Sequence, residues 1–481
     1  MQQSAKVSKL YAVSLVFIFF TAFCALQYPD YLFIAVPLSF LFIIICLVSI
    51  EWLFLIVAFC TPFSIEYNIG DSVLNIPSEP LMIIFLGLFV VKILQDYQNQ
   101  KELFKQALSL IIVLNLAWIF ITTLTSTLPL ISFKFLLARL WMVFFGYFWG
   151  AIIFKNPKRI KQFFLAFGLG LCIVIIYTTF NHYHEGFTQK RAMMVMKPLM
   201  DDHTVYSAVC AIAFCFTTTI LFAKSVTKSF FNRLIFTGVA VLSFIGVGLS
   251  YSRAAVISLI FAFAFYLLIY FKVRFKTMLI VFFMSLCVAF FYQNEIYQKV
   301  RSNKTVSGKT IVGDLKSVTN IKNDDSNVER LNRWEAGYRM FLEKPFLGFG
   351  PGTYMFKYSS YQRAHEMTSI STTQGDMGNI HSEYFGPLVD SGVIGFLITL
   401  ILFGYSIHHL LQLHYTTQNK ETKYLSLAIL LALVSYYVHG VMNNFLDQDK
   451  IGVIFWAMFG MITALRLNEK TNAIDVEVKN N

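Results

Sequence analysis

Two neighbouring segments organise this chain: VERLNRWEAGYRMFLEKPFLGFGPGTY at residues 328–354 and HSEYFGPLVDSGVIG at residues 381–395. They close a long polar loop and lead directly into the second of two blocks of hydrophobic segments. In the first segment, apolar residues recur at three- and four-residue spacing, which predicts an amphipathic helix. These residues are Val328, Leu331, Trp334, Tyr338 and Phe341. Pro345 is expected to end the helix.

Arg330 and Arg333 are three residues apart, so a helix presents both guanidinium groups on one side. Such groups bind phosphate-type anions through paired hydrogen bonds. His381 lies just before the next hydrophobic segment, where a histidine commonly caps a helix or makes a structural hydrogen bond. Beside these arginines it can instead act as a general base, with a pKa of roughly 6.5. Glu383 either orients this imidazole or is a first-turn acid favoured by the helix dipole.

The stretch Gly348–Gly352 resembles a phosphate-binding loop, but no predicted strand precedes it and no Lys-Ser/Thr pair follows it. We therefore exclude a nucleotide-binding fold and predict a tight turn that orients the arginine-bearing helix against the membrane. The acidic pairs Asp324-Asp325 and Asp201-Asp202 have no convincing metal-ligating neighbours in the sequence. We predict chemistry without a metal ion.

The composition places the chain in a membrane. Hydrophobic residues make up 57% of the sequence, with 51 Phe, and only 14% of residues are charged. Too few polar side chains are present to cover a water-soluble surface, so most apolar faces must meet lipid. In this context the formal charge of +12 is divided between the two sides of the membrane and does not indicate nucleic acid. All seven cysteines lie in apolar segments, which argues against a disulfide framework or a cysteine metal site.

Fourteen apolar runs have the character of membrane spans. They lie at residues 10–26, 31–47, 49–63, 80–95, 106–125, 132–154, 162–180, 204–223, 233–250, 254–271, 277–292, 385–409, 424–440 and 452–467. The first run follows Lys6 and Lys9 without a small-residue cleavage site, so we interpret it as a retained span. The predicted fold class is an all-α polytopic membrane protein with about 12–14 transmembrane helices.

The distribution of Lys and Arg predicts the orientation. With both termini in the cytoplasm, the inner loops are rich in basic residues, for example at 155–161 and 272–276. The short outer loops contain few: Lys190, Arg191, Lys197, Arg253 and Lys450. The resulting domains are a transmembrane bundle at 1–292, a large periplasmic loop with amphipathic helices at 293–384, transmembrane helices at 385–467 and a cytoplasmic tail at 468–481.

Several basic residues outside the two segments are also candidates for the site. Arg191 and Lys197 share one outer loop, where a single arginine often only contacts lipid headgroups. Arg253 lies in a tight turn between two long apolar runs, at a depth where a charge must snorkel, pair or face a wet cavity. Lys134 and Arg139 lie halfway along one span, where we expect them to face the bundle and pair with polar groups.

The segments around residues 330–395 resemble the O-antigen ligase and polymerase superfamily of bacterial membrane glycan transferases. The matching residues are Arg330, Trp334, Ala336, Pro345, Gly348, Gly350, Gly352, His381, Tyr384, Gly392 and Gly395. The superfamily also has arginines in positions similar to Arg191 and Arg253. The resemblance implies catalysis by His381, Arg253 and Arg191, with Arg330, Arg333, Lys197 and Glu383 binding substrate and no cofactor.

By this resemblance the chain is a glycan transferase of the bacterial inner membrane with its active site on the periplasmic side. The donor would be a glycan on undecaprenyl diphosphate, and the acceptor a sugar hydroxyl of lipid A core or another glycan. An O-antigen or exopolysaccharide polymerase and a protein O-oligosaccharyltransferase are alternatives. A transporter or flippase is a further alternative, although the charges cluster on one outer face rather than at mid-membrane.

Overall fold

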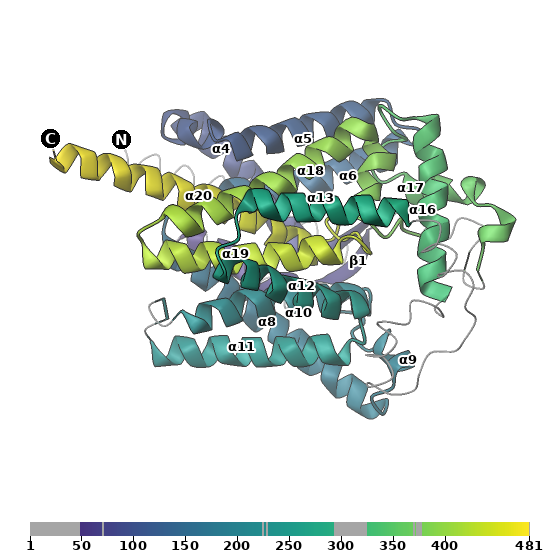
Figure 1. Ribbon diagram of the computed structural model, residues 1–481, viewed down its shortest axis with the longest axis horizontal. Coiled ribbons are helices and arrows are strands. Elements are labelled where there is room, and N and C mark those ends of the chain that lie inside the picture. The colour runs from purple at the N-terminus through teal and green to yellow at the C-terminus, as the bar shows by residue number, and fades with distance from the viewer. Residues whose placement is uncertain are drawn as a thin grey trace, which may run out of the picture.

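The computed structural model describes residues 49–69, 72–223, 226–227, 229–292, 325–368, 371 and 378–480 (Figure 1). Its elements in chain order are α3 (Ile50–Cys60), η2 (Thr61–Phe63), β1 (Ile65–Ile69), β2 (Ser72–Ile76), α4 (Ser78–Phe104), α5 (Ala107–Leu124), α6 (Pro129–Val143), η3 (Phe144–Trp149), α7 (Gly150–Ile153), α8 (Pro157–His184), α9 (Gln189–Ala192), α10 (His203–Phe222), α11 (Phe230–Leu249), α12 (Arg253–Tyr270), α13 (Phe275–Phe291), α16 (Asp325–Glu343), α17 (Tyr354–Lys357), η4 (Tyr358–Tyr361), η5 (Ala364–Glu366), α18 (Phe385–Thr416), α19 (Lys420–His439) and α20 (Asp449–Asn480).

The predicted fold class is confirmed. Among the described residues, 10 helical stretches are long and apolar enough to cross a membrane, and α3 with η2 forms a shorter apolar helix. Every predicted span from residue 49 onward coincides with a described helix. The predicted spans at 10–26 and 31–47 lie outside the described residues.

The helices differ in how deeply they are buried. Within their apolar windows, 83% of the residues of α19 and α20 are buried, against 22% for α12. The last two helices therefore form the centre of the bundle, and others surround them. Large apolar side chains on the outer helices face outward, among them Phe222, Phe230 and Leu94. These exposed aromatic and aliphatic surfaces require lipid around the bundle.

One end of the bundle collects the loops that carry the chemistry. Figure 1 shows α16 running across the ends of the membrane helices, with α9 and α17 at the same end. The C-terminal end of α20 projects from the opposite end. The candidate residues in these loops therefore share one end of the bundle, as the charge distribution predicted.

A small antiparallel hairpin of β1 and β2, which the sequence analysis did not predict, lies before α4. It packs at the start of α20 through buried polar groups. The Ser64 hydroxyl donates to Asp449 Oδ2 (2.6 Å), and Lys450 Nζ donates to Asn75 Oδ1 (2.7 Å). Lys450 was counted as an outer-loop charge, but its side chain is buried and also pairs with Asp449 (3.1 Å). The hairpin therefore anchors the N-terminal end of the central helix.

Candidate active site

The imidazole of His381 lies against the guanidinium group of Arg333, with 2.9 Å between Nε2 and Nη1. Two further bonds fix this guanidinium: Nη1 donates to the carbonyl of Asn379 (2.8 Å) and Nε donates to Glu329 Oε1 (3.0 Å). The side chains of Arg333 and Glu329 are largely buried. A guanidinium group can only donate, so Nε2 of His381 is the acceptor. The proton of the neutral imidazole is therefore on Nδ1.

The backbone around His381 is held on both sides. His381 itself has a φ of 54°, a left-handed conformation that is uncommon for a residue with a side chain. The indole N–H of Trp334 donates to the carbonyl of Ile380 (3.0 Å), and its ring stacks on Phe385 with centroids 5.5 Å apart. The Ser382 hydroxyl accepts from the amide of Phe385 (3.3 Å). The helix before the loop and the helix after it thus fix the imidazole position together.

The pKa of His381 is lowered to about 3, mainly by burial and then by the positive charges of Arg333 and Arg330, while Asp202 opposes the shift. The sequence-based expectation of a pKa near the ordinary value is therefore wrong, because it could not include the burial. The imidazole is neutral at any physiological pH. This is the protonation state that a general base requires.

Three arginines from two different helices act on one another in this region. Burial, followed by the charges of Arg253 and Arg333, lowers the pKa of Arg330 to about 10, while Asp202 opposes the shift. Arg253 is the first residue of α12, whereas Arg330 and Arg333 lie on α16. Nε of Arg330 also donates to the carbonyl of Met442 (3.2 Å). Together with His381, these arginines form what we call the cationic cluster: Arg253, Arg330, Arg333 and His381.

The sequence analysis missed three residues next to the cationic cluster. Asp202 acts electrostatically on both Arg330 and His381, and its Oδ1 caps α10 at the amides of Thr204 (2.6 Å) and Val205 (3.0 Å). The charges of Asp202 and Arg330 also act on the imidazole groups of His203 and His439. The acidic pair at 201–202 was visible in the sequence, but only as a metal candidate. No motif or pattern in the sequence pointed to His439, which lies in the last turn of the buried helix α19.

The loop between α8 and α10 places Arg191 and Lys197 at the same end of the bundle as the cluster. Nε of Arg191 pairs with Glu185 (3.0 Å), and its side chain is 61% exposed. Lys197 is exposed, and its carbonyl accepts a hydrogen bond from the Tyr177 hydroxyl (2.9 Å). The structure thus brings Arg253, Arg330, Arg333 and His381 together and leaves the other two at the surface of a flanking loop.

Glu383 is buried behind the His381 segment. Its Oε1 accepts from the hydroxyl of Tyr436 and from the amides of Phe445 (2.6 Å) and Leu446 (3.0 Å). Burial, followed by the charge of Asp447, raises its pKa to about 7, against the opposing effect of these hydrogen bonds. The carboxyl group therefore fixes the loop between α19 and α20 and does not contact the imidazole.

The glycine-rich loop docks onto a break in α18. At Gly392 the backbone turns left-handed, with a φ of 68°, and leaves carbonyl groups of the preceding turn free of helix partners. The amides of Phe349 and Gly350 donate to the carbonyls of Val389 (3.0 Å) and Asp390 (2.9 Å). A Cβ atom at Gly392 would collide with the loop backbone. The prediction of a tight turn after α16 is confirmed, and the turn joins this helix to α18.

Residues 238–400 match the family model described as O-antigen ligase. This match is consistent with the O-antigen ligase superfamily. The match spans all four residues of the cationic cluster and includes the glycine-rich loop and the broken start of α18. Arg191 and Lys197 lie outside it. No curated protein matches the chain.

The family match is consistent with the ten apolar helices found among the described residues. The family implies glycosyltransferase-like activity in general, with a lipid-linked glycan donor and a glycan acceptor. The resemblance deduced from the motif residues is therefore confirmed. The matched region begins in α11 and ends within α18. It includes the parts of the chain that hold His381 and the arginines in place.

Proposed function

We propose that this O-antigen ligase family member is a metal-independent transferase that acts on the periplasmic face of the bacterial inner membrane. It moves a glycan from undecaprenyl diphosphate to a sugar hydroxyl of lipid A core. The observation that carries the proposal is the contact between His381 and Arg333, within the electrostatic field of Arg330 and Arg253. An uncharged proton acceptor beside three cations suits a hydroxyl acceptor and a diphosphate donor.

In the proposed reaction, the acceptor hydroxyl gives its proton to Nε2 of His381, and its oxygen attacks the anomeric carbon of the donor glycan. The bond from this carbon to the phosphate oxygen breaks, and the electron pair leaves with the carrier diphosphate. The guanidinium groups stabilise the added negative charge, which develops as the bond breaks. The buried position of these groups strengthens this interaction relative to water.

Arg333 couples donor binding to the base. In the arrangement described here, its Nη1 donates to the lone pair of Nε2, so that lone pair is occupied. A diphosphate competes for the same N–H because hydrogen bonds between two charged groups are stronger than those to a neutral acceptor. Binding of the donor therefore frees Nε2 to accept the proton. The base is exposed only when a donor is present, which disfavours hydrolysis of other groups.

A lipid-linked donor explains why a transferase is built from membrane helices. The isoprenoid tail stays in lipid, while the diphosphate reaches the end of the bundle where the cationic cluster lies. The periplasmic assignment rests on the bias of Lys and Arg toward the opposite loops. The proposed acceptor, lipid A core, is also held at a membrane surface.

Deletion of the gene followed by gel analysis of the surface glycan tests the acceptor. A ligase predicts lipid A core without long chains, together with long chains that remain on the carrier. Core that carries a single repeat unit would indicate a polymerase instead, and loss of glycan from proteins would indicate a protein glycosyltransferase. Unchanged glycan in all three fractions would contradict transferase activity. Complementation with the wild-type gene is the control.

A further inference from the structure

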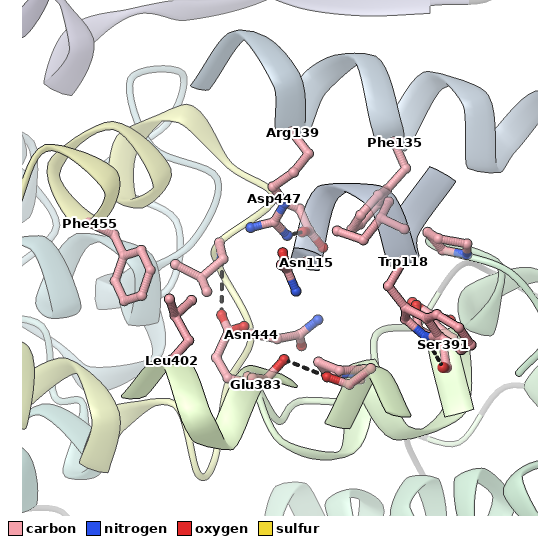
Figure 2. A pocket seen from close by; sticks show the side chains of 18 of the residues that line it. Asn115, Trp118, Phe135, Arg139, Glu383, Ser391, Leu402, Asn444, Asp447 and Phe455 are labelled. Atoms are coloured by element: carbon pink, nitrogen blue, oxygen red, sulfur yellow. Dashed lines mark hydrogen bonds and ion pairs between the residues drawn. The ribbon is translucent and has the colours of Figure 1, made fainter. Parts of the chain in front are cut away.

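A second polar site lies on the opposite side of the His381 segment. It is a cavity of about 80 Å³ between α5, α6, α18 and the start of α20 (Figure 2). Figure 2 shows the side chains of Arg139, Asn115, Asn444 and Asp447 around one open space. The cavity holds on the order of five or more water molecules, which is about the space of one sugar ring.

The cavity is acidic, unlike the cationic cluster. Three carboxyl groups line it, from Glu383, Asp390 and Asp447, against one guanidinium group from Arg139. That guanidinium is already paired with Asp447 (2.6 Å), as the sequence analysis expected for a mid-span arginine. The lining residues include no other cation, so nothing here compensates the charge of a diphosphate. The ligand of this cavity is therefore uncharged or cationic.

Several buried polar atoms of the lining residues have no hydrogen-bond partner within the described part of the chain. They are two donors, Nε of Arg139 and Nε1 of Trp456, and two acceptors, Oδ1 of Asp390 and Oδ1 of Asn444. Arg139 and Trp456 are 9% and 2% exposed. Buried polar groups are normally satisfied, and lining residues that carry both unpartnered donors and unpartnered acceptors suit a ligand with hydroxyl groups.

Aromatic rings complete the lining and fit the same ligand class. Trp118, Phe135, Phe455 and Trp456 contribute to the wall. The N–H of Trp118 is already used, because it donates to the carbonyl of Ser391 (2.8 Å) at the break in α18. Ring faces with a few directed polar groups are typical of small-molecule pockets. They match a pyranose, which has an apolar ring face and hydroxyl groups at its edge.

We propose that this cavity binds one uncharged sugar ring of the glycan substrates, so that the cationic cluster takes the diphosphate and the cavity takes the sugar. The inference rests on the proposed transferase function, because it assumes that both ligands belong to one reaction. Ser382 lines the cavity and directly follows His381, so a sugar bound here lies next to the base segment. The sugar belongs either to the donor or to the acceptor.

Binding measurements on the purified full-length chain test the cavity. The probes are the oligosaccharide released by mild acid from the source cell's surface glycan and inorganic pyrophosphate. Trp456→Phe removes one indole N–H and keeps a ring in the wall. Trp141→Phe is the matched control, because its buried indole N–H also has no partner in the described residues, yet Trp141 does not line the cavity. Asn115→Leu is a second cavity variant that keeps a similar side-chain size.

We expect Trp456→Phe and Asn115→Leu each to weaken oligosaccharide binding about tenfold, with Trp141→Phe close to wild type. Pyrophosphate binding should be unchanged in all three variants. A rise in KM for one co-substrate alone, at constant kcat, then identifies whether the sugar is from the donor or the acceptor. Equal oligosaccharide binding in all variants would overturn the proposal that the cavity binds a sugar. So would a wild type that binds pyrophosphate but no oligosaccharide. Loss of pyrophosphate binding and of transfer in wild type would contradict the proposed function itself.

Discussion

The two sides of the segment from Ile380 to Ser391 have opposite chemistry. On one side, the cationic cluster has three arginines and a neutral imidazole. On the other side, the cavity has three carboxyl groups, one paired arginine and aromatic walls. The first side offers several cations to an anion, whereas the arginine on the second side is already paired with Asp447. In the proposed reaction, this one backbone segment separates the charged part of the substrate from its uncharged part.

The separation has a structural cause in the broken start of α18. A continuous helix would satisfy its own carbonyl groups and would leave no place for the glycine-rich loop. Because the helix breaks at Gly392, amides of that loop and the indole of Trp118 reach the freed carbonyls. The loop holds α16 with its arginines on one side, and Trp118 lines the cavity on the other. The break therefore positions both sites.

The largest expected effect concerns the side of the membrane. In a variant without the seven native cysteines, Cys at His365 should react completely with an impermeant maleimide added to intact spheroplasts, and Cys at Lys158 should not. Both side chains are exposed, and they lie at opposite ends of the bundle by the predicted topology. Permeabilised cells are the control, where both should react. The reverse pattern would remove the periplasmic assignment of both sites.

The next effect is on the base. His381→Gln should lower kcat by about 10³-fold, because an amide can replace a hydrogen bond but cannot accept a proton at neutral pH. Pyrophosphate binding should persist, since the arginines remain. His414→Gln is the control, because Nδ1 of that histidine contacts only a backbone carbonyl, of Lys423 (3.0 Å), at the other end of the bundle. Wild-type turnover by the His381 variant would reduce the imidazole to a structural role.

A smaller loss is expected from changing the shape of one cation. Arg253→Lys keeps the charge but loses the planar pair of donors, so transfer should fall about 10²-fold, nearly as far as with Arg253→Ala. Arg191→Lys should change transfer less, because Arg191 is exposed and paired with Glu185 in the flanking loop. Reconstituted transfer assays measure both. Full activity of Arg253→Lys would contradict the role of Arg253 in the cationic cluster. A larger loss at Arg191 would place Arg191 in the site instead.

The smallest expected effect is the response to pH, and it differs between His381 on one side of the segment and Glu383 on the other. With a pKa of about 3, His381 is neutral between pH 6 and 8, so its titration should change kcat less than twofold in this range. The pKa of Glu383 is about 7, so this carboxyl group does titrate between pH 6 and 8. Because its pKa is raised on folding, its contribution to stability is present at low pH and is lost as pH rises from about 4.5 through 7.

Thermal unfolding at pH 5 and pH 8 measures the contribution of Glu383, and Glu383→Gln should remove that part of the pH dependence. A clear rise of kcat through pH 6.5 that disappears in His381→Gln would show instead that the imidazole titrates near its ordinary value. Glu366→Gln is a suitable control, because this buried carboxyl pairs with Arg339 away from the segment.

Much of the architecture followed from local sequence. Long apolar runs specify membrane helices because the bilayer leaves the backbone no other way to satisfy its hydrogen bonds. Positions of the helices after residue 48 were therefore predictable one by one, and so was the amphipathic helix with Arg330 and Arg333. The hairpin of β1 and β2 was not, because two five-residue strands beside long apolar runs leave little signal in hydrophobic periodicity.

The sequence by itself determined the class of protein and the resemblance to the superfamily, and it named the four residues of the cationic cluster, since each of these is carried by composition or by a local motif. The tertiary structure decided what depends on distance: the contact of Arg333 with His381, the low pKa of that histidine, and the presence of Asp202 and His439 beside them. It also decided that Glu383 faces the loop after α19 and that the acidic cavity exists. Residues from tens to hundreds of positions apart form these contacts. Burial, which sets their electrostatics, belongs to no single segment.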